Sequence, residues 1–447
     1  MKIIIAGAYA IGSHLAKLLS RNNQDIVLID DDEQRLENIS SDYDILTMHA
    51  SPTSLAALKN AGAAEANLYI AVTPDENLNM NSCVMAKAIG AKKTVAKVNN
   101  YEFVEPEMAK FYEKLGIDSL IYPENLAAYD IVNGLKMSWV RQRWDVHGGA
   151  LVMLGIKLRE TCEIRDRPLK ELCKPDSPYY IVAIRRDGDT IIPGGNDVLK
   201  MYDLVYFMVT KQYIPYVRKI VGKEHYVDVK NVMIMGGGDT AVRALKNMPE
   251  YMNVKLMEHD VERCDILNDQ IDDQRVMVIN GDGRDLQLLN EEGIHTTQAF
   301  VALTSNAETN ILACLTAKRM GVRKTVAAVE NLDYVNMAVS LDIGTIINKK
   351  AIAASHIYQM MLDAEVNNVR FLMTANADVA EFTAHPESKV TKKRVFELGL
   401  PNGATIGGLV RNGEGHLVSG GTQIEAGDIV VVFCYNVRME TLEKFFK

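Results

Sequence analysis

The stretch GAYAIG, residues 7–12, stands between the apolar run 2–6 and a helical pattern at residues 11–21. This is the placement of the Gly-x-Gly-x-x-Gly turn that opens a dinucleotide-binding βαβ unit, where the middle glycine lets a phosphate approach the backbone. Tyr9 occupies the middle position here. The stretch therefore predicts a strand, a tight turn and a helix, with a tyrosine side chain where a pyrophosphate would otherwise lie.

The same pattern returns in mid-chain, and the repeat extends over the whole length. GGGDTA (236–241) follows NVMIM (231–235) as GAYAIG follows KIIIA. Further pairs keep their order, among them DIVLIDDDEQR (25–35) with NVKLMEHDVER (253–263), and LYIAVTPDENLNM (68–80) with AFVALTSNAETNI (299–311). A fainter repeat pairs 167–209 with 393–435. Self-similarity of this extent indicates that one structural unit was duplicated.

Each large repeat alternates β-rich runs with helical runs, which predicts a parallel sheet with helices on both faces. The first repeat has expected strands at 2–6, 25–29, 45–48, 68–72 and 94–98, and expected helices at 11–21, 32–40, 53–60 and 76–90. The small repeats are mostly strands, with hairpin-turn signals at Asp187-Gly188 and Asn412-Gly413.

The predicted fold class is therefore α/β, with two doubly wound parallel-sheet Rossmann domains, each followed by a small α+β domain. We expect the four domains at residues 1–140, 141–228, 229–368 and 369–447.

Composition limits the function classes. The 447 residues carry a net charge of −9, which argues against a nucleic-acid partner. The six cysteines form no C-x-x-C pair, as expected for reduced thiols in a cytosolic protein, and no apolar run approaches the ~18 residues that span a membrane. We expect no metal site and no catalytic residue, because the histidines and cysteines show neither metal-ligand spacing nor a nucleophile motif.

An acidic residue follows the second expected strand in each repeat. Asp30 ends DIVLID and Glu258 ends NVKLME. This is where a carboxylate accepts hydrogen bonds from the ribose of a dinucleotide. A 2′-phosphate would meet these carboxylates as a like charge, so NADP is disfavoured in both repeats.

Three further residues stand where doubly wound folds open their ligand crevice. Thr73 and Thr304 follow the fourth strands, where each either contacts phosphate or ribose or only caps the next helix. Thr73, with Pro74 at the first helical position and Glu76 as the capping-box acid, reads as a helix start. Asp282 follows the third strand of the second repeat and meets an adenine amino group or caps a helix.

GAYAIGSHLAKLL (7–19), the Asp30 strand end, AVTPDENLNM (71–80) and AKVNN (96–100), with their second copies, resemble the TrkA (tandem RCK, or KTN) family of bacterial Trk potassium uptake systems. The resemblance covers essentially the full length. It implies a cytoplasmic regulatory subunit, peripheral at the inner face of the membrane, that forms a homo-oligomeric ring under a potassium-translocating subunit of the Trk type. It also implies that NAD(H), and further ATP or ADP, bind the Rossmann domains and gate potassium flow.

Carried over residue by residue, the resemblance implies two sets of nucleotide-binding residues. The first comprises Gly7, Ala8, Tyr9, Ala10, Ile11, Gly12, Asp30, Thr73, Pro74 and Val98. The second comprises Gly236, Gly237, Gly238, Asp239, Thr240, Glu258, Asp282, Thr304 and Ser305. We expect the first site to bind dinucleotide more weakly, because Tyr9 blocks close approach of a phosphate to the backbone.

Two alternatives to a regulator stay open at this stage. An NAD-dependent oxidoreductase shares the nucleotide fold, but a second Rossmann unit and small β modules stand here in place of a substrate domain with a proton donor. A structural scaffold with non-functional pockets would show no nucleotide-dependent stabilisation. If the chain is a regulator, the helical runs at 123–140 and 349–364 are the expected pairing surfaces of the Rossmann units.

Overall fold

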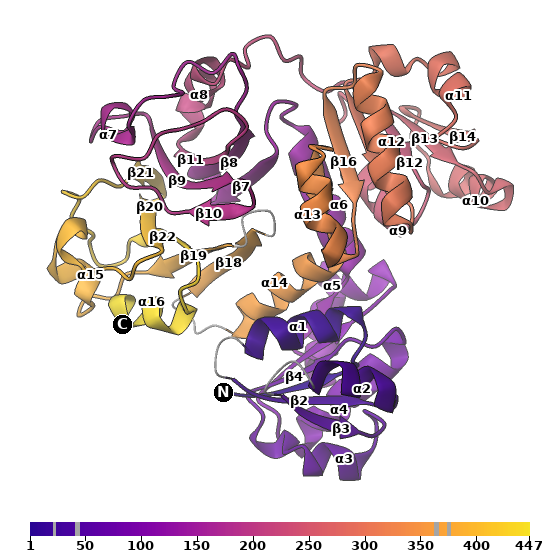
Figure 1. The fold of residues 1–447 in the computed structure, drawn as a ribbon. Coiled ribbons are helices and arrows are strands. Elements are labelled where there is room, and N and C mark those ends of the chain that lie inside the picture. The colour runs from indigo at the N-terminus through magenta and orange to yellow at the C-terminus, as the bar shows by residue number, and fades with distance from the viewer. Residues whose placement is uncertain (21–23, 41–44, 362–365, 373–376) are drawn as a thin grey trace. The chain divides into compact units, whose positions relative to one another are not determined.

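The computed structural model describes residues 1–20, 24–40, 45–361, 366–372 and 377–447 (Figure 1). The chain divides into two compact units. The first unit comprises residues 1–126 and 349–361, and the second comprises residues 127–348 and 362–447. Each is described separately.

The first unit holds a six-stranded parallel sheet in the order β3-β2-β1-β4-β5-β6. The chain reverses its direction across the sheet between β1 and β4, which is where doubly wound folds bind ligands. Its strands are β1 (Lys2–Ala6), β2 (Asp25–Asp30), β3 (Leu46–His49), β4 (Leu68–Ala71), β5 (Lys93–Lys97) and β6 (Ser119–Ile121). Its helices are α1 (Ala10–Ser20), α2 (Glu33–Ser40), α3 (Leu55–Asn60), α4 (Glu76–Ile89) and α5 (Pro106–Lys114), with α6 (Pro123–Leu135) continuing into the second unit.

Burial explains why these runs form central strands. Ile3, Ile4 and Ile5 are consecutive and fully buried, as expected for a parallel strand with helices on both faces. The predicted strands and helices of the first repeat are confirmed to within two residues at each described end; residue 21 of the first predicted helix lies outside the described residues. The predicted fold class is confirmed as well.

The second unit repeats this sheet in the order β14-β13-β12-β15-β16-β17. Its strands are β12 (Asn231–Met235), β13 (Asn253–Glu258), β14 (Val276–Asn280), β15 (Ala299–Ala302), β16 (Lys324–Ala328) and β17 (Thr345–Ile347). Its helices are α9 (Asp239–Lys246), α10 (Val261–Gln270), α11 (Leu286–Glu291), α12 (Ala307–Arg319) and α13 (Leu332–Ser340).

The helix that follows this second sheet belongs to the first unit. Helix α14 (Lys349–Met361) packs against α1, and the Lys349 ammonium lies 3.2 Å from a carboxylate oxygen of Glu124. The run predicted at 349–364 therefore pairs with a Rossmann unit of the same chain, and its last three residues lie outside the described part.

The two small domains carry matching antiparallel sheets, in the orders β10-β9-β11-β8-β7 and β18-β19-β22-β20-β21. The first contains β7 (Gln142–Val146), β8 (Leu151–Lys157), β9 (Tyr179–Arg186), β10 (Asp189–Ile191) and β11 (Leu204–Val209), with α7 (Leu169–Leu172) and α8 (Ile214–Ile220). The second contains β18 (Val366–Leu372), β19 (Ala377–Thr383), β20 (Ala404–Arg411), β21 (Glu414–Leu417) and β22 (Ile429–Cys434), with α15 (Lys389–Lys392) and α16 (Met439–Phe446). Strand β18 begins at Val366, so it crosses the boundary predicted at residue 368.

Both predicted hairpin turns form. Asp187 and Gly188 have φ of 50° and 96°, and Asn412 and Gly413 have φ of 52° and 83°, which is the two-residue turn that matches strand twist.

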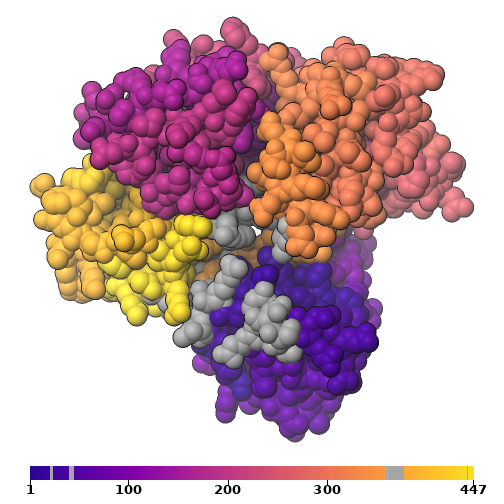
Figure 2. All heavy atoms as spheres, viewed as in Figure 1, coloured from indigo at the N-terminus to yellow at the C-terminus, as the bar shows by residue number. Residues whose placement is uncertain are grey.

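The small domains share one apolar core. Trp144, Leu151 and Tyr206 of the first pack with Val431 and Phe433 of the second. Figure 2 shows the two domains in contact, in magenta and yellow. Burying this shared apolar surface joins them into one body.

Among the described residues, no helix is both long enough and apolar enough to cross a lipid bilayer.

Candidate functional site

The glycine turn of the second repeat connects β12 to α9. Gly236 has φ of 100°, and a Cβ there would lie 3.0 Å from the Thr304 backbone nitrogen, so only glycine fits. This close approach brings the turn against Thr304, at the end of β15. A Cβ on Gly237 would lie 2.4 Å from Leu267. The first glycine is therefore required by the backbone, and a side chain at the second would have to displace Leu267.

Gly238 is different. Its φ and ψ are −72° and 175°, an ordinary extended conformation, and a Cβ there would meet no atom within 4 Å. The position holds open space just before the first turn of α9. Helix amino ends with free amides are common anion sites. Backbone strain therefore does not require this glycine, which leaves open space at the start of α9.

Glu258, at the end of β13, lies under this turn. One of its carboxylate oxygens accepts a hydrogen bond from Gly237 N at 2.7 Å, and the other lies 3.0 Å from Asp260 N and 2.8 Å from His259 Nδ1. Burial acts to raise the pKa of Glu258, but the backbone bonds from Asp260 and Gly237 and the His259 ring leave it below its ordinary value. The side chain stays an anion with lone pairs to offer a ribose.

The first repeat builds the same contact. Ala8 N donates to Asp30 Oδ2 at 2.5 Å, and Asp30 is 2% exposed. Gly7 has φ of 105° and packs against Thr73, and a Cβ on Gly12 would lie 1.8 Å from Gly7 O. The structure thus brings the predicted turn, acid and threonine together in both repeats.

The Tyr9 ring packs against Arg35. It lies under the Arg35 guanidinium, whose carbon is 4.0 Å from the ring centroid, and Arg35 Nε donates to Asp30 Oδ1 at 3.0 Å. Tyr9 has no positive φ, so the tyrosine causes no backbone strain. The ring therefore stacks within its own domain, between the turn and α2.

The arginine at the matching position of the second repeat behaves differently. Arg263 Nε donates to Gly237 O at 2.9 Å, and Arg263 Nη2 lies 3.5 Å from Asp239. The Glu258 carboxylate has no arginine partner among the described residues. The first acid is neutralised by a cation and the second is not.

Two asparagines that the sequence analysis missed hold Thr73 and Thr304 in place by hydrogen bonds. Asn79 accepts a hydrogen bond from Thr73 Oγ1 at 2.7 Å and donates to Lys97 O at 2.9 Å. Asn310 makes the matching bonds to Thr304 Oγ1 at 2.7 Å and Ala328 O at 2.9 Å. Both asparagines are fully buried. The signal was present as Thr-x5-Asn in both copies.

The predicted helix caps are wrong. Asp75 caps α4 by accepting from Asn77 N and Leu78 N, while the Glu76 carboxylate accepts from Asn99 N and Asn100 N. The cap lies two residues after Thr73 because α4 begins at Glu76, and the Thr73 hydroxyl donates to Asn79 and to Asp75 O instead. Asn306 likewise caps α12.

The remaining predicted residues differ in how far their side chains are exposed to solvent. Pro74, Asp239 and Ser305 are exposed near the ends of the turns and strands, and Val98 is fully buried, so it offers no side-chain surface to a ligand. Ala10 begins α1. Ile11 is partly buried and Thr240 is buried in α9.

Asp282 does not cap α11, whose cap is Asp285. The Asp282 carboxylate instead binds Arg284 N at 2.9 Å and the Arg284 guanidinium at 2.7 Å. The Arg284 bond lowers the pKa of Asp282. Its carboxylate is 46% exposed, and its contact with an adenine stays a prediction.

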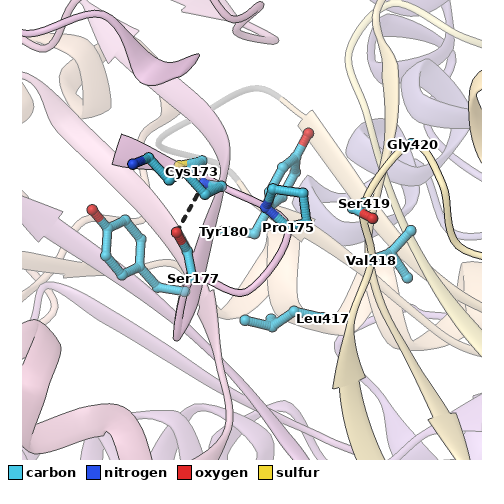
Figure 3. A pocket seen from close by; sticks show the side chains of 10 residues that line it. Cys173, Pro175, Ser177, Tyr180, Leu417, Val418, Ser419 and Gly420 are labelled. Atoms are coloured by element: carbon cyan, nitrogen blue, oxygen red, sulfur yellow. Dashed lines mark hydrogen bonds between the residues drawn. The ribbon is translucent and has the colours of Figure 1, made fainter. Parts of the chain in front are cut away.

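A separate cavity of about 200 Å³ lies between the small domains (Figure 3). It is lined by Cys173, Ser177 and Tyr180 on one side and by Leu417 to Gly420 on the other. Ser177 Oγ accepts a hydrogen bond from Lys174 N at 2.8 Å. The cavity lies in the small domains and contains none of the predicted nucleotide residues.

Tandem Rossmann domains with an acid under each turn, each followed by a small companion domain, define a duplicated nucleotide-fold architecture. The TrkA-N domain family matches residues 3–123 and 232–349, and the TrkA-C domain family matches residues 153–222 and 379–447. The chain therefore belongs to the TrkA family.

The similarity to known relatives extends over essentially the full length of both chains. The chain is 29% identical to the Trk system potassium uptake protein TrkA of Haemophilus influenzae, covering 100% of this chain and 99% of the relative, and 29% identical to that of Halomonas elongata with the same coverage. Among solved structures, it is similar to the GsuK RCK domain, with a TM-score of 0.59, 16% identity and coverage of 100% and 94%. It is also similar to the GsuK channel bound to NAD, with a TM-score of 0.59, 15% identity and coverage of 100% and 78%.

Proposed function

We propose that this chain is a regulatory subunit that binds adenine nucleotides in its two Rossmann domains and thereby controls a Trk-type membrane subunit that translocates potassium. The observation that carries the proposal is the duplicated contact between a buried acid and a glycine turn, Glu258 with Gly237 and Asp30 with Ala8. The full-length similarity to proteins named for potassium uptake supports the same conclusion.

NAD(H) is the proposed ligand, and ATP or ADP would compete for the same adenosine contacts. Glu258 would accept hydrogen bonds from ribose hydroxyls, and the open space at Gly238 would admit the pyrophosphate beside the amides of α9. One solved structure of similar fold is a channel bound to NAD. NADP remains disfavoured at the second site, because a 2′-phosphate would face a carboxylate that has no arginine partner among the described residues.

Two sites in one chain favour regulation over catalysis. Ligands at two linked pockets bias one conformational equilibrium whenever they bind its two states unequally. We propose that the chain catalyses no reaction, assembles as a homo-oligomeric ring and acts from the cytoplasm at the inner face of the membrane. No nucleic acid is involved.

Calorimetry and thermal unfolding of the full chain with NAD, NADH, ATP, ADP and AMP test the binding step. A ligand at a hundred times its Kd should add about 2.7 kcal/mol to the free energy of unfolding. No stabilisation by any nucleotide would contradict the proposal. NADH oxidation that depends on a 2-keto acid would instead identify an oxidoreductase.

Potassium uptake by cells that express a Trk-type membrane subunit, with and without this chain, tests the regulatory step. Uptake should respond to the wild-type chain and lose that response with Gly238→Tyr. Equal uptake with and without the chain would contradict the proposed regulation, even if the chain binds nucleotides.

A further inference from the structure

Asp342 lies in the turn between α13 and β17 and collects cations from three segments of the second unit. Its carboxylate is 2.9 Å from Arg141 Nη2 and 3.1 Å from Lys318 Nζ, and it also pairs with Arg159. Burial acts to raise the pKa of Asp342, but these cations hold it far below its ordinary value. One negative charge thus faces three positive charges from the first small domain and α12.

A second group of cations surrounds Tyr226. Lys223 Nζ donates to Tyr226 Oη at 3.0 Å, and the Arg323 guanidinium carbon is 5.1 Å from the Tyr226 ring centroid. Lys223 is only 4% exposed. Burial acts to raise the pKa of Tyr226, yet the hydrogen bond from Lys223 and the charges of Lys223, Arg159 and Arg141 leave it below its ordinary value. The two groups therefore share one positive field.

Lys157, at the end of β8, adds a further charge. Among the described residues, no carboxylate lies within 4 Å of Lys157, Lys223 or Arg323. Asp342 and Asp203 act on Lys157 from a distance, but Asp342 already pairs with three other cations and Asp203 pairs with Arg186 at 2.7 Å. Arg323 is exposed, but the other cations are buried or partly buried, where charges are poorly screened, so this surplus of positive charge is electrostatically costly without an anion. We call these six cations the basic cluster: Arg141, Lys157, Arg159, Lys223, Lys318 and Arg323.

The first repeat supplies an internal control. By the repeat, Lys87 corresponds to Lys318, and Lys92 corresponds to Arg323. Lys87 pairs with Asp118 at 2.8 Å, one cation with one anion, whereas Lys318 shares Asp342 with two arginines. Lys92 and Arg323 are both exposed, so the difference between the repeats at these positions lies in the cations gathered around Asp342.

We propose that the basic cluster is a binding site for a multiply charged phosphate anion, either a free polyphosphate or the phosphates of a nucleotide. Arg323 and Lys318 stand before the amino end of β16, whereas the glycine turn lies at the carboxyl ends of the strands of the same sheet. The cluster is thus separate from the nucleotide turn. An anion there would tie the first small domain to the second Rossmann domain. This inference goes beyond the proposed function and does not depend on it.

Thermal unfolding of the full chain with tripolyphosphate, ATP or AMP, at constant ionic strength near 0.15 M KCl, tests the proposal. Tripolyphosphate should raise the Tm of the wild type by several degrees and AMP much less. Arg323→Gln should remove most of that rise, whereas its matched control Lys92→Gln should keep it. Gly238→Tyr should also keep it, because the nucleotide turn is elsewhere.

Lys157→Gln separates a ligand site from a structural cluster. Removing a surplus cation should leave the Tm without ligand unchanged or higher and should reduce the rise with tripolyphosphate. If the ATP effect is lost together with the tripolyphosphate effect, the anion is a nucleotide; if only the tripolyphosphate effect is lost, it is free polyphosphate. An equal rise in the wild type, Arg323→Gln and Lys157→Gln, or no rise in the wild type, would overturn the proposal.

Discussion

The two glycine turns differ at one decisive residue, Tyr9 in the first repeat and Gly238 in the second. In the first, the tyrosine ring stacks on Arg35, and Arg35 neutralises Asp30. In the second, the matching space is open and Glu258 has no arginine partner among the described residues. The backbone path is compatible with either residue, so the two copies keep the same fold and differ in the side chains that surround the turn.

Gly238→Tyr should break this asymmetry most strongly. Its Cβ meets no atom within 4 Å, so the variant should fold normally while its ring fills the phosphate space. We expect NAD binding at the second site to fall about a hundredfold, roughly 3 kcal/mol. Calorimetry measures this, with Gly238→Ala as the matched control that leaves most of the space open. An unchanged tight binding event would show that the ligand does not use this turn.

Lys324→Met extends the comparison to the fifth strands. Lys324 is 1% exposed and donates to Val140 O at 2.6 Å and Thr345 Oγ1 at 3.1 Å, whereas its counterpart Lys93 is exposed. Burial lowers the pKa of Lys324 to about 7. The unfolded chain then binds the proton more tightly than the folded chain between about pH 7 and pH 10, so the lysine reduces stability increasingly as pH falls through this window.

The lowered pKa corresponds to about 4 kcal/mol of lost stability at pH 7 and about 1 kcal/mol at pH 9.5, so the variant's gain in the free energy of unfolding should be about 3 kcal/mol larger at pH 7 than at pH 9.5. Denaturant unfolding at the two pH values measures the difference. Lys93→Met should change stability little at either pH. A loss of stability in Lys324→Met that does not vary with pH would mean that its two hydrogen bonds outweigh its buried charge.

Glu258→Gln should weaken NAD binding at the second site about tenfold, near 1.4 kcal/mol, because an amide is a poorer partner for ribose hydroxyls than a carboxylate. Asp30→Asn should change the first site less, since Arg35 already neutralises that acid. Because the pKa of Glu258 is lowered, the wild-type affinity should stay constant as pH falls from 8 to 6. Equal losses from both substitutions would mean that the two acids serve equivalent sites.

Of these substitutions, Tyr9→Gly should have the smallest effect on the difference in nucleotide affinity between the two turns. Removing the ring opens the first turn and should strengthen the weaker binding event about fivefold, near 1 kcal/mol. Tyr9→Phe is the matched control, because it keeps the ring under Arg35 and should leave binding unchanged. If Tyr9→Gly instead weakens binding, the ring is a ligand contact.

Much of the architecture follows from local pattern. The isoleucine run 3–5, the glycine turns and the duplicated order predicted the sheets, because buried parallel strands need continuous apolar residues and the turns need positive φ at Gly7 and Gly236. The placement of Asp30 and Glu258 was equally local. These features repeat in the sequence and depend on residues close along the chain.

Other features depended on side-chain contacts that the strand, turn and helix patterns do not specify. Asn79 accepts the Thr73 hydroxyl from six residues away, and Asp75 caps α4. Arg35 positions the Tyr9 ring. The basic cluster brings together cations that are far apart in the sequence, around Asp342 and Tyr226. The sequence by itself determined the duplicated nucleotide fold and its acids, because strand, turn and helix signals are local. Only the tertiary structure decided how the two turns differ and where surplus charge collects, because both arise from side chains that meet after folding.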